Sequence, residues 1–180
     1  MISKPNKICL WTRSLFVTYI LLLVWLVLFK LDFVIPHRAR DVNLIPFYYQ
    51  SVANWRLPVR EAVANVVAFL PMGIYLKMLS VRNRFIVIGG FATSFAFEII
   101  QFAFAMGIAD VTDLITNTLG TVCGMLLYIL LCRLFASTER VNRGLLMVGM
   151  VGTVLAEFYF IMTLSLNALM AGLLAAFLGG

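Results

Sequence analysis

Charged residues, histidine and cysteine are all scarce in this sequence, and each shortage excludes a class of protein. Charged residues account for 12% of the 180 residues and hydrophobic residues for 63%, and the mean hydropathy is +1.01. No aqueous core buries an apolar fraction of this size, so a soluble globular protein is excluded. The one histidine, His37, has no second histidine with which to bind a metal, and a Ser-His pair is not expected. We therefore predict an integral membrane protein.

The three cysteines, Cys9, Cys123 and Cys132, form no C-x-x-C pair and lie in or beside apolar sequence. They are predicted to be small core residues, with no disulfide and no zinc site. The sequence also lacks an internal repeat, a glycine-rich phosphate loop and a nucleophile-elbow motif, so no catalytic residue, metal or cofactor is assigned. The net charge of +6 is interpreted as attraction to anionic membrane lipids, and no nucleic-acid partner is expected.

Five apolar segments predict an all-α polytopic membrane bundle, because each is close to the ~20 residues that cross a hydrocarbon core of ~30 Å. The first segment has no small-x-small cleavage site after it, so it is expected to stay as an anchor. The segments are residues 15–35, 62–79, 85–106, 111–135 and 145–166. The corresponding division is a cytoplasmic tail at 1–14, a four-helix core at 15–135 with an outer loop at 36–60, and an additional C-terminal transmembrane helix and tail at 136–180.

The distribution of Lys and Arg predicts the orientation of the chain. An inside N-terminus and an outside C-terminus place nine of the fourteen basic residues inside and five outside, which follows the positive-inside rule. All five outer ones lie between Lys30 and Arg60, with Asp32, Asp41 and Glu61 close by in the sequence. Salt bridges or anionic ligands would explain this excess.

Polar side chains recur at helical spacing inside the apolar segments. Gly90, Ser94, Glu98 and Gln101 are spaced four, four and three residues apart, which places them on one face of the third helix. A carboxylate at bilayer depth costs several kcal/mol unless it is paired, protonated or hydrated. This face is therefore predicted to point inward, and an intramembrane site is the first hypothesis. Glu157 lies at a similar depth in the last segment.

The fourth helix repeats the pattern with Asp113, Asn117, Gly120 and Gly124. The two glycines form a small-xxx-small pattern that permits close helix packing. Asp113 also suits the positive N-terminus of a helix, so capping plus packing is an equally good explanation. In the second helix, Asn65 is followed by a proline that is expected to bend the helix and by a glycine that leaves room for the bend. The helix-packing candidates are Pro71, Gly73, Gly120 and Gly124.

The first outer loop combines Pro46 with a run of aromatic residues from Phe47 to Tyr49. Such aromatics favour the headgroup region of a membrane, so an interfacial belt without a ligand is one interpretation. Guanidinium groups match phosphate oxygens, so the basic residues beside the loop favour a lipid head group as the other. The candidates for this contact are Arg38, Arg40 and Arg56. The candidate pocket that the loop would cap comprises Asn43, Arg60, Asn65, Glu98, Gln101, Asp110, Asp113 and Asn117.

Four short segments combine the polar and helix-packing residues described above. They are Asn43-Leu-Ile-Pro-Phe47, Asn65-Val-Val-Ala-Phe-Leu-Pro-Met-Gly73, Glu98-Ile-Ile-Gln101 and Asp110-Val-Thr-Asp-Leu-Ile-Thr-Asn-Thr-Leu-Gly120. In order and spacing these segments resemble the four signature blocks of the VanZ-like family. The first span and the block at 104–110 are particularly similar to the member found in glycopeptide-resistance gene clusters. The likeness covers about residues 15–135.

The resemblance implies a bacterial cell-membrane protein that contributes to glycopeptide resistance, against teicoplanin, which carries a lipid tail, more than against vancomycin. It implies no mechanism residue by residue. Many members have an arginine shortly before the aspartate pair, where this chain has Gly107-Ile108-Ala109. If that arginine neutralises the acids, Arg38, Arg40 or Arg60 would have to substitute for it here, and the ligand could differ. Residues after Phe135 match no signature block.

Three functions are compatible with this sequence. The first is binding, in which the outer pocket engages a membrane-embedded cell-wall lipid precursor or the lipid-anchored glycopeptide. The second is an intramembrane enzyme acting on a lipid-linked phosphate or saccharide, and a divalent cation is conceivable only in this case. The third is a helix-packing scaffold or small transporter, where a homodimer would supply symmetry through Gly120 and Gly124 or through Gly149 and Gly152.

Overall fold

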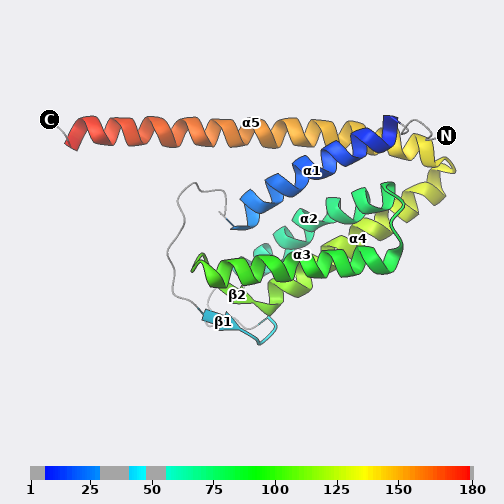
Figure 1. Ribbon diagram of the computed structural model, residues 1–180, viewed down its shortest axis with the longest axis horizontal. Helices are drawn as coiled ribbons and strands as arrows, with labels where there is room; N and C mark the ends of the chain where they lie inside the picture. The colour runs from blue at the N-terminus through cyan, green and yellow to red at the C-terminus, as the bar shows by residue number, and fades with distance from the viewer. Residues whose placement is uncertain (1–6, 29–40, 48–55, 179–180) are drawn as a thin grey trace, which may run out of the picture.

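A computed structural model of the chain contains five long helices and one short parallel β-ribbon (Figure 1). It describes residues 7–28, 41–47 and 56–178. Within these ranges, five helices are long and apolar enough to cross a membrane, which confirms the predicted all-α membrane bundle. The elements are α1 (Lys7–Leu28), β1 (Asp41–Asn43), α2 (Arg56–Met78), α3 (Asn83–Ala103), β2 (Ile108–Asp110), α4 (Val111–Phe135) and α5 (Thr138–Leu178).

The helix boundaries agree with the predicted spans for α4 and differ most for α1 and α5. Helix α1 begins at Lys7 and not at residue 15, so part of the predicted tail is helical. Helix α5 has 41 residues and continues to Leu178 instead of ending at 166, which makes it about 60 Å long. Hydropathy marks only the bilayer-length part of a helix, and strong helix formers such as Ala and Leu carry the helix beyond it.

Helices α2 and α4 form the closest helix pair, because glycines bring their backbones into contact. A Cβ atom added to Gly73 would lie 2.0 Å from the Thr121 carbonyl oxygen. The same atom on Gly120 would lie 2.3 Å from the Val66 carbonyl oxygen, and on Gly124 1.9 Å from that of Leu70. Only glycine fits at these positions.

Helix α3 packs on α4 through the predicted polar face. Gly90, Ser94, Glu98 and Gln101 are all buried, which confirms the inward orientation of this face. Helix α1 packs against α2 and α5 on the other side of the pair. Leu23 of α1 is only 2% exposed and packs in a cluster that includes Phe69 of α2.

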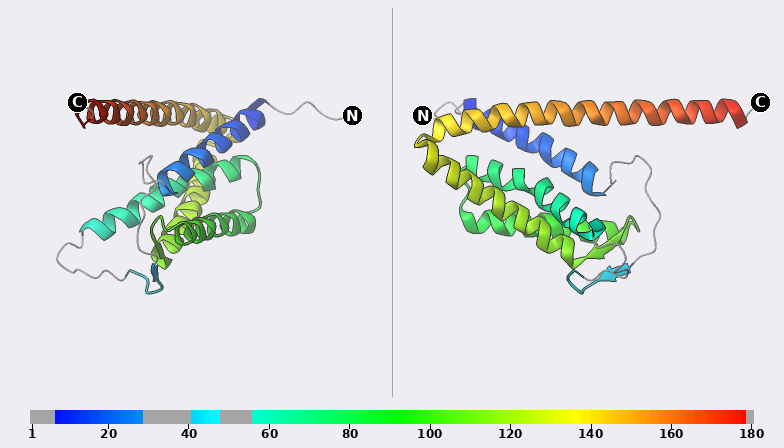
Figure 2. Two further views of the ribbon diagram at one scale, coloured as in Figure 1. Left: turned by 60° about the vertical axis from the view of Figure 1, so that its left-hand side comes forward. Right: turned by 180° about the vertical axis from the view of Figure 1, so that it is seen from behind.

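The two ends of the bundle differ in what they contain (Figures 1 and 2). One end, which we call the basic end, holds the start of α1, the α2–α3 turn and the α4–α5 corner. The other, the ribbon end, holds β1, β2 and the N-terminus of α4. Helix α5 continues past α1 toward its C-terminus, and its apolar side chains between Met147 and Met170 are largely exposed. The predicted candidate site lies at the ribbon end.

Candidate functional site

The ribbon joins the first loop to the N-terminus of α4. Strand β1 pairs with β2 in parallel, and Asn43 stands opposite Asp110 in the register. The Asn43 Nδ2 donates a hydrogen bond of 3.0 Å to Asp110 Oδ2. The backbone N–H of Phe47 donates to Thr112 Oγ1 over 3.0 Å. Residues 41–47 are therefore fixed over the start of α4.

Asp110 is the N-cap of α4 and is connected on three sides. Its Oδ1 accepts a hydrogen bond of 2.7 Å from the Thr112 N–H, which satisfies one of the backbone donors left free at a helix start. Its negative charge also lies at the positive end of the helix dipole. Its own backbone N–H donates to Glu98 Oε2 over 2.9 Å, so Glu98 of α3 is linked to the segment that leads into α4.

Two further amide side chains connect α4 to its neighbouring helices. The Asn65 Nδ2 of α2 donates to Asp113 Oδ1 over 2.7 Å. The Asn117 Nδ2 of α4 donates to Ser94 Oγ of α3 over 2.9 Å. Asn117 is 2% exposed, and its Oδ1 has no hydrogen-bond partner in the described part of the chain. Because Asn117 lies one helical turn after Asp113, this oxygen sits deeper in the bundle than the carboxylates.

These side chains form one cluster, which we call the polar network. It connects β1, α2 and α3 to the first two turns of α4, and Thr112 belongs to it although the sequence did not single it out. The sequence signal was Asp110 itself, since an aspartate directly before a helix is a typical N-cap that accepts from the backbone N–H two or three residues later. The polar network comprises Asn43, Asn65, Ser94, Glu98, Asp110, Thr112, Asp113 and Asn117.

Two of the eight predicted pocket residues lie outside this network. The Gln101 Nε2 donates to the Val27 carbonyl oxygen of α1 over 3.1 Å, so Gln101 joins α3 to α1. Arg60 is exposed on α2. Arg38 and Arg40 lie outside the described residues, and only the backbone of Arg56 is described. Glu157, which was placed at a similar depth to Glu98, is exposed on α5.

The dimer seam proposed through Gly120 and Gly124 is wrong. Both glycines are buried against α2, so they are not available to a second copy of the chain. Pro71 lies within α2 and lines the cavity described next.

One cavity lies away from the polar network. It has a volume of about 550 Å³ and lies between α1, α2 and α5, where Tyr19, Trp25, Pro71 and Tyr159 are among its lining residues. None of the eight predicted pocket residues lines it. Among the described residues, no group of three His, Cys, Asp or Glu side chains is placed to hold a metal ion.

Comparison with known proteins identifies relatives of the chain. The family model described as VanZ/LLP1 matches residues 16–133, which include α2, α3, most of α4 and the polar network. "Protein VanZ" from Enterococcus faecium is 36% identical over 154 residues, which cover 82% of this chain and 91% of that protein. No solved structure matches. The family match spans more than half of the chain and the curated relative is similar along most of its length, so the chain belongs to the VanZ/LLP1 family.

Proposed function

We propose that the chain is a multi-pass bacterial cell-membrane protein that contributes to glycopeptide resistance. The observation that carries this proposal is its 36% identity to Protein VanZ over most of both chains. In this proposal the polar network engages a membrane-embedded cell-wall lipid precursor, or the lipid-anchored drug, and so lowers productive drug binding.

The composition of the polar network supports a binding role beyond helix packing. Hydrogen bonds between spans contribute about 0.6 to 2 kcal/mol each, and amides suffice for them. Carboxylates are more costly within a membrane, yet Glu98, Asp110 and Asp113 all gather at the start of α4. The presence of three acids where amides would hold the helices favours a ligand.

The nature of the unsatisfied atom is consistent with the proposed ligands. A buried acceptor without a donor costs about 1 to 3 kcal/mol, and among the described residues Asn117 Oδ1 is such an acceptor. Peptide and sugar head groups carry N–H and O–H donors that can satisfy an amide oxygen. A cell-wall precursor and a glycopeptide both present such groups next to a lipid chain.

The test is drug susceptibility of a sensitive Gram-positive host that expresses the protein, measured with teicoplanin and with vancomycin at matched membrane levels. Wild type is expected to protect against teicoplanin more than against vancomycin. Asp113→Asn and Glu98→Gln are expected to lose this protection, because each replaces a carboxyl group by an amide while keeping an oxygen that can accept the existing hydrogen bond. Glu61→Gln is the matched control, since Glu61 is exposed on α2, and it should protect like wild type.

The outcomes separate the two parts of the proposal. If wild type protects and both network variants protect as well as wild type, the polar network is not the site. If wild type gives no protection at verified levels, the resistance function itself is wrong. A changed profile of cell-wall lipid precursors in the protected cells would indicate that the protein acts as an enzyme and not by binding.

A further inference from the structure

The corner between α4 and α5 is a tight, well-fixed feature of the basic end. Ala136 has a left-handed conformation, with φ of 48°, and ends α4. The Ser137 carbonyl oxygen accepts from the Val141 N–H over 3.1 Å, so α5 begins directly after Ser137. The Tyr128 hydroxyl of α4 then donates to Asn142 Oδ1 of α5 over 2.9 Å. The chain reverses within a few residues, and the two helix ends are held together.

This corner contains an open groove with an apolar floor. Its volume is about 310 Å³. Gly144 contributes free space, because a Cβ atom added there would meet no atom within 4 Å. Arg140 is the charged residue among those that line the groove. The lining residues are Leu131, Phe135, Arg140, Val141, Gly144 and Leu145.

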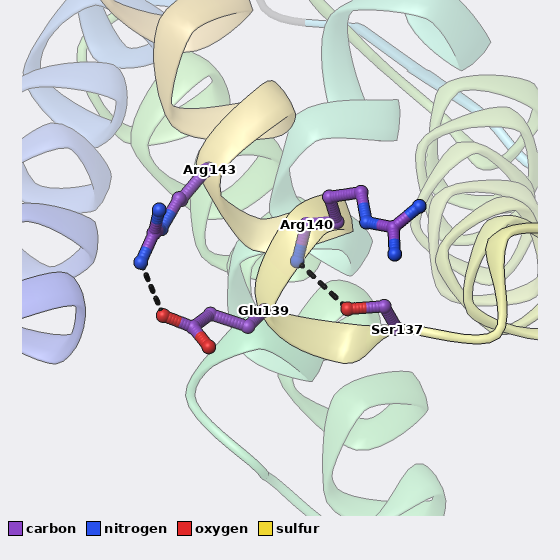
Figure 3. Close-up of polar contacts among 4 residues, drawn as sticks. All are labelled: Ser137, Glu139, Arg140 and Arg143. Carbon is purple, nitrogen blue, oxygen red and sulfur yellow. Dashed lines mark hydrogen bonds and ion pairs between the residues drawn. The ribbon is translucent and has the colours of Figure 1, made fainter.

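The charge at the edge of the groove is not neutralised by the residues around it (Figure 3). Glu139 forms an ion pair with Arg143. The Arg140 backbone N–H donates to Ser137 Oγ over 3.4 Å, while its guanidinium points away from Glu139 and forms no hydrogen bond or ion pair within the described ranges. Arg133 in the last turn of α4 is also exposed. The corner therefore has three arginines for one glutamate.

We propose that this groove binds an anionic phospholipid of the inner leaflet, with Arg140 on the lipid phosphate and the apolar floor against the upper part of an acyl chain. Guanidinium groups bind phosphate oxygens through paired N–H donors. Basic pockets between membrane helices on the cytoplasmic side are typical sites for anionic lipids. The proposal is separate from the polar network, which lies at the opposite end of the bundle (Figure 1).

The test is lipid retention by the full-length purified protein, measured by native mass spectrometry after addition of phosphatidylglycerol or the neutral phosphatidylcholine. Wild type is expected to retain phosphatidylglycerol several-fold more. Arg140→Gln should bind the two lipids about equally, because it loses the group that contacts the phosphate. Arg143→Gln is the matched control, since Arg143 is already paired with Glu139, and it should keep the wild-type preference.

A second variant tests the apolar floor without changing charge. Gly144→Leu fills the groove with little steric conflict and should lower retention of phosphatidylglycerol while thermal stability stays close to that of wild type. Gly152→Leu is its control, because Gly152 is equally open and lies outside the groove. Equal retention of both lipids by wild type overturns the proposal. So does an equal loss of preference in Arg140→Gln and Arg143→Gln, because that result indicates general surface charge.

Discussion

At the scale of single residues, Asp110 holds the candidate site together. Its two carboxylate oxygens accept hydrogen bonds from Thr112 and Asn43, and its backbone N–H donates to Glu98. Buried polar groups are tolerated when they are hydrogen-bonded. The pairing of Asp110 with Asn43 therefore supports the ribbon, and the Asp110 N–H links Glu98 to the start of α4.

The pairing of Asn43 with Asp110 predicts that exchanging the two residues restores the stability that either single substitution loses. Asn43→Asp alone sets two carboxylates against each other, and Asp110→Asn alone sets two amide groups together, although an asparagine still caps α4. Each single variant is expected to lower the free energy of unfolding by roughly 1 to 2 kcal/mol. The double variant restores the bond in the reverse direction and should regain most of this loss.

Thermal unfolding in detergent, monitored by the reaction of the half-buried cysteines with a thiol dye, measures the effect of this exchange. Because the double variant keeps an acceptor for the Thr112 N–H and for the Ile45 N–H, it needs no other change. A double variant as unstable as the sum of the two single variants would show that these side chains do not interact.

The residues of the network were predictable from spacing, but their partners were not. The intervals between Ser94, Glu98 and Gln101 place them on one face of a helix, and that face is buried. Spacing gives no information about distance to other segments, so the bond from Gln101 to the Val27 carbonyl oxygen of α1 was not foreseen. The three-residue strands were also missed, because segments so short have no periodic pattern.

At the scale of the helices, the contact of α2 with α4 is set by glycines that have no room for a side chain. The pattern of Gly120 and Gly124 predicted close approach of some helix but did not identify which one. The structure shows that the partner is α2, where Gly73 provides the complementary space. Two helices of one chain thus use the surface that a dimer would have needed.

This contact predicts that replacing glycine by alanine lowers stability at Gly124 but not at Gly152. Gly124→Ala places a Cβ atom 1.9 Å from the Leu70 carbonyl oxygen, so the helices must separate, and we expect a loss of at least about 1 to 3 kcal/mol of stability. Gly152→Ala is the control, because its Cβ meets nothing within 4 Å and alanine favours a helix over glycine. Melting temperatures that fall equally in both variants would contradict the close packing of α2 on α4.

At the scale of the whole molecule, charge is concentrated at one end of the bundle. Ten lysines and arginines lie in the described segments, and eight of these are at the basic end, whereas the other two, Arg56 and Arg60, lie in the first turns of α2. The eight are Lys7, Arg13, Lys77, Arg82, Arg84, Arg133, Arg140 and Arg143. The fold thus gathers basic residues from three separate stretches of the sequence at one end of the bundle.

This asymmetry predicts that the basic end faces the cytoplasm and the ribbon end faces outward. Cytoplasmic loops of membrane proteins carry the excess of Lys and Arg, and α5 runs from the basic end toward the opposite side (Figure 2). A fluorescent protein fused to the N-terminus should therefore fluoresce, and alkaline phosphatase fused to the C-terminus should be active. As a control, alkaline phosphatase placed after Ser80 in the α2–α3 turn should be inactive. The reverse pattern would place the polar network on the cytoplasmic side, where an extracellular glycopeptide does not reach it, and would exclude the proposed mode of drug interference along with the inner-leaflet lipid site.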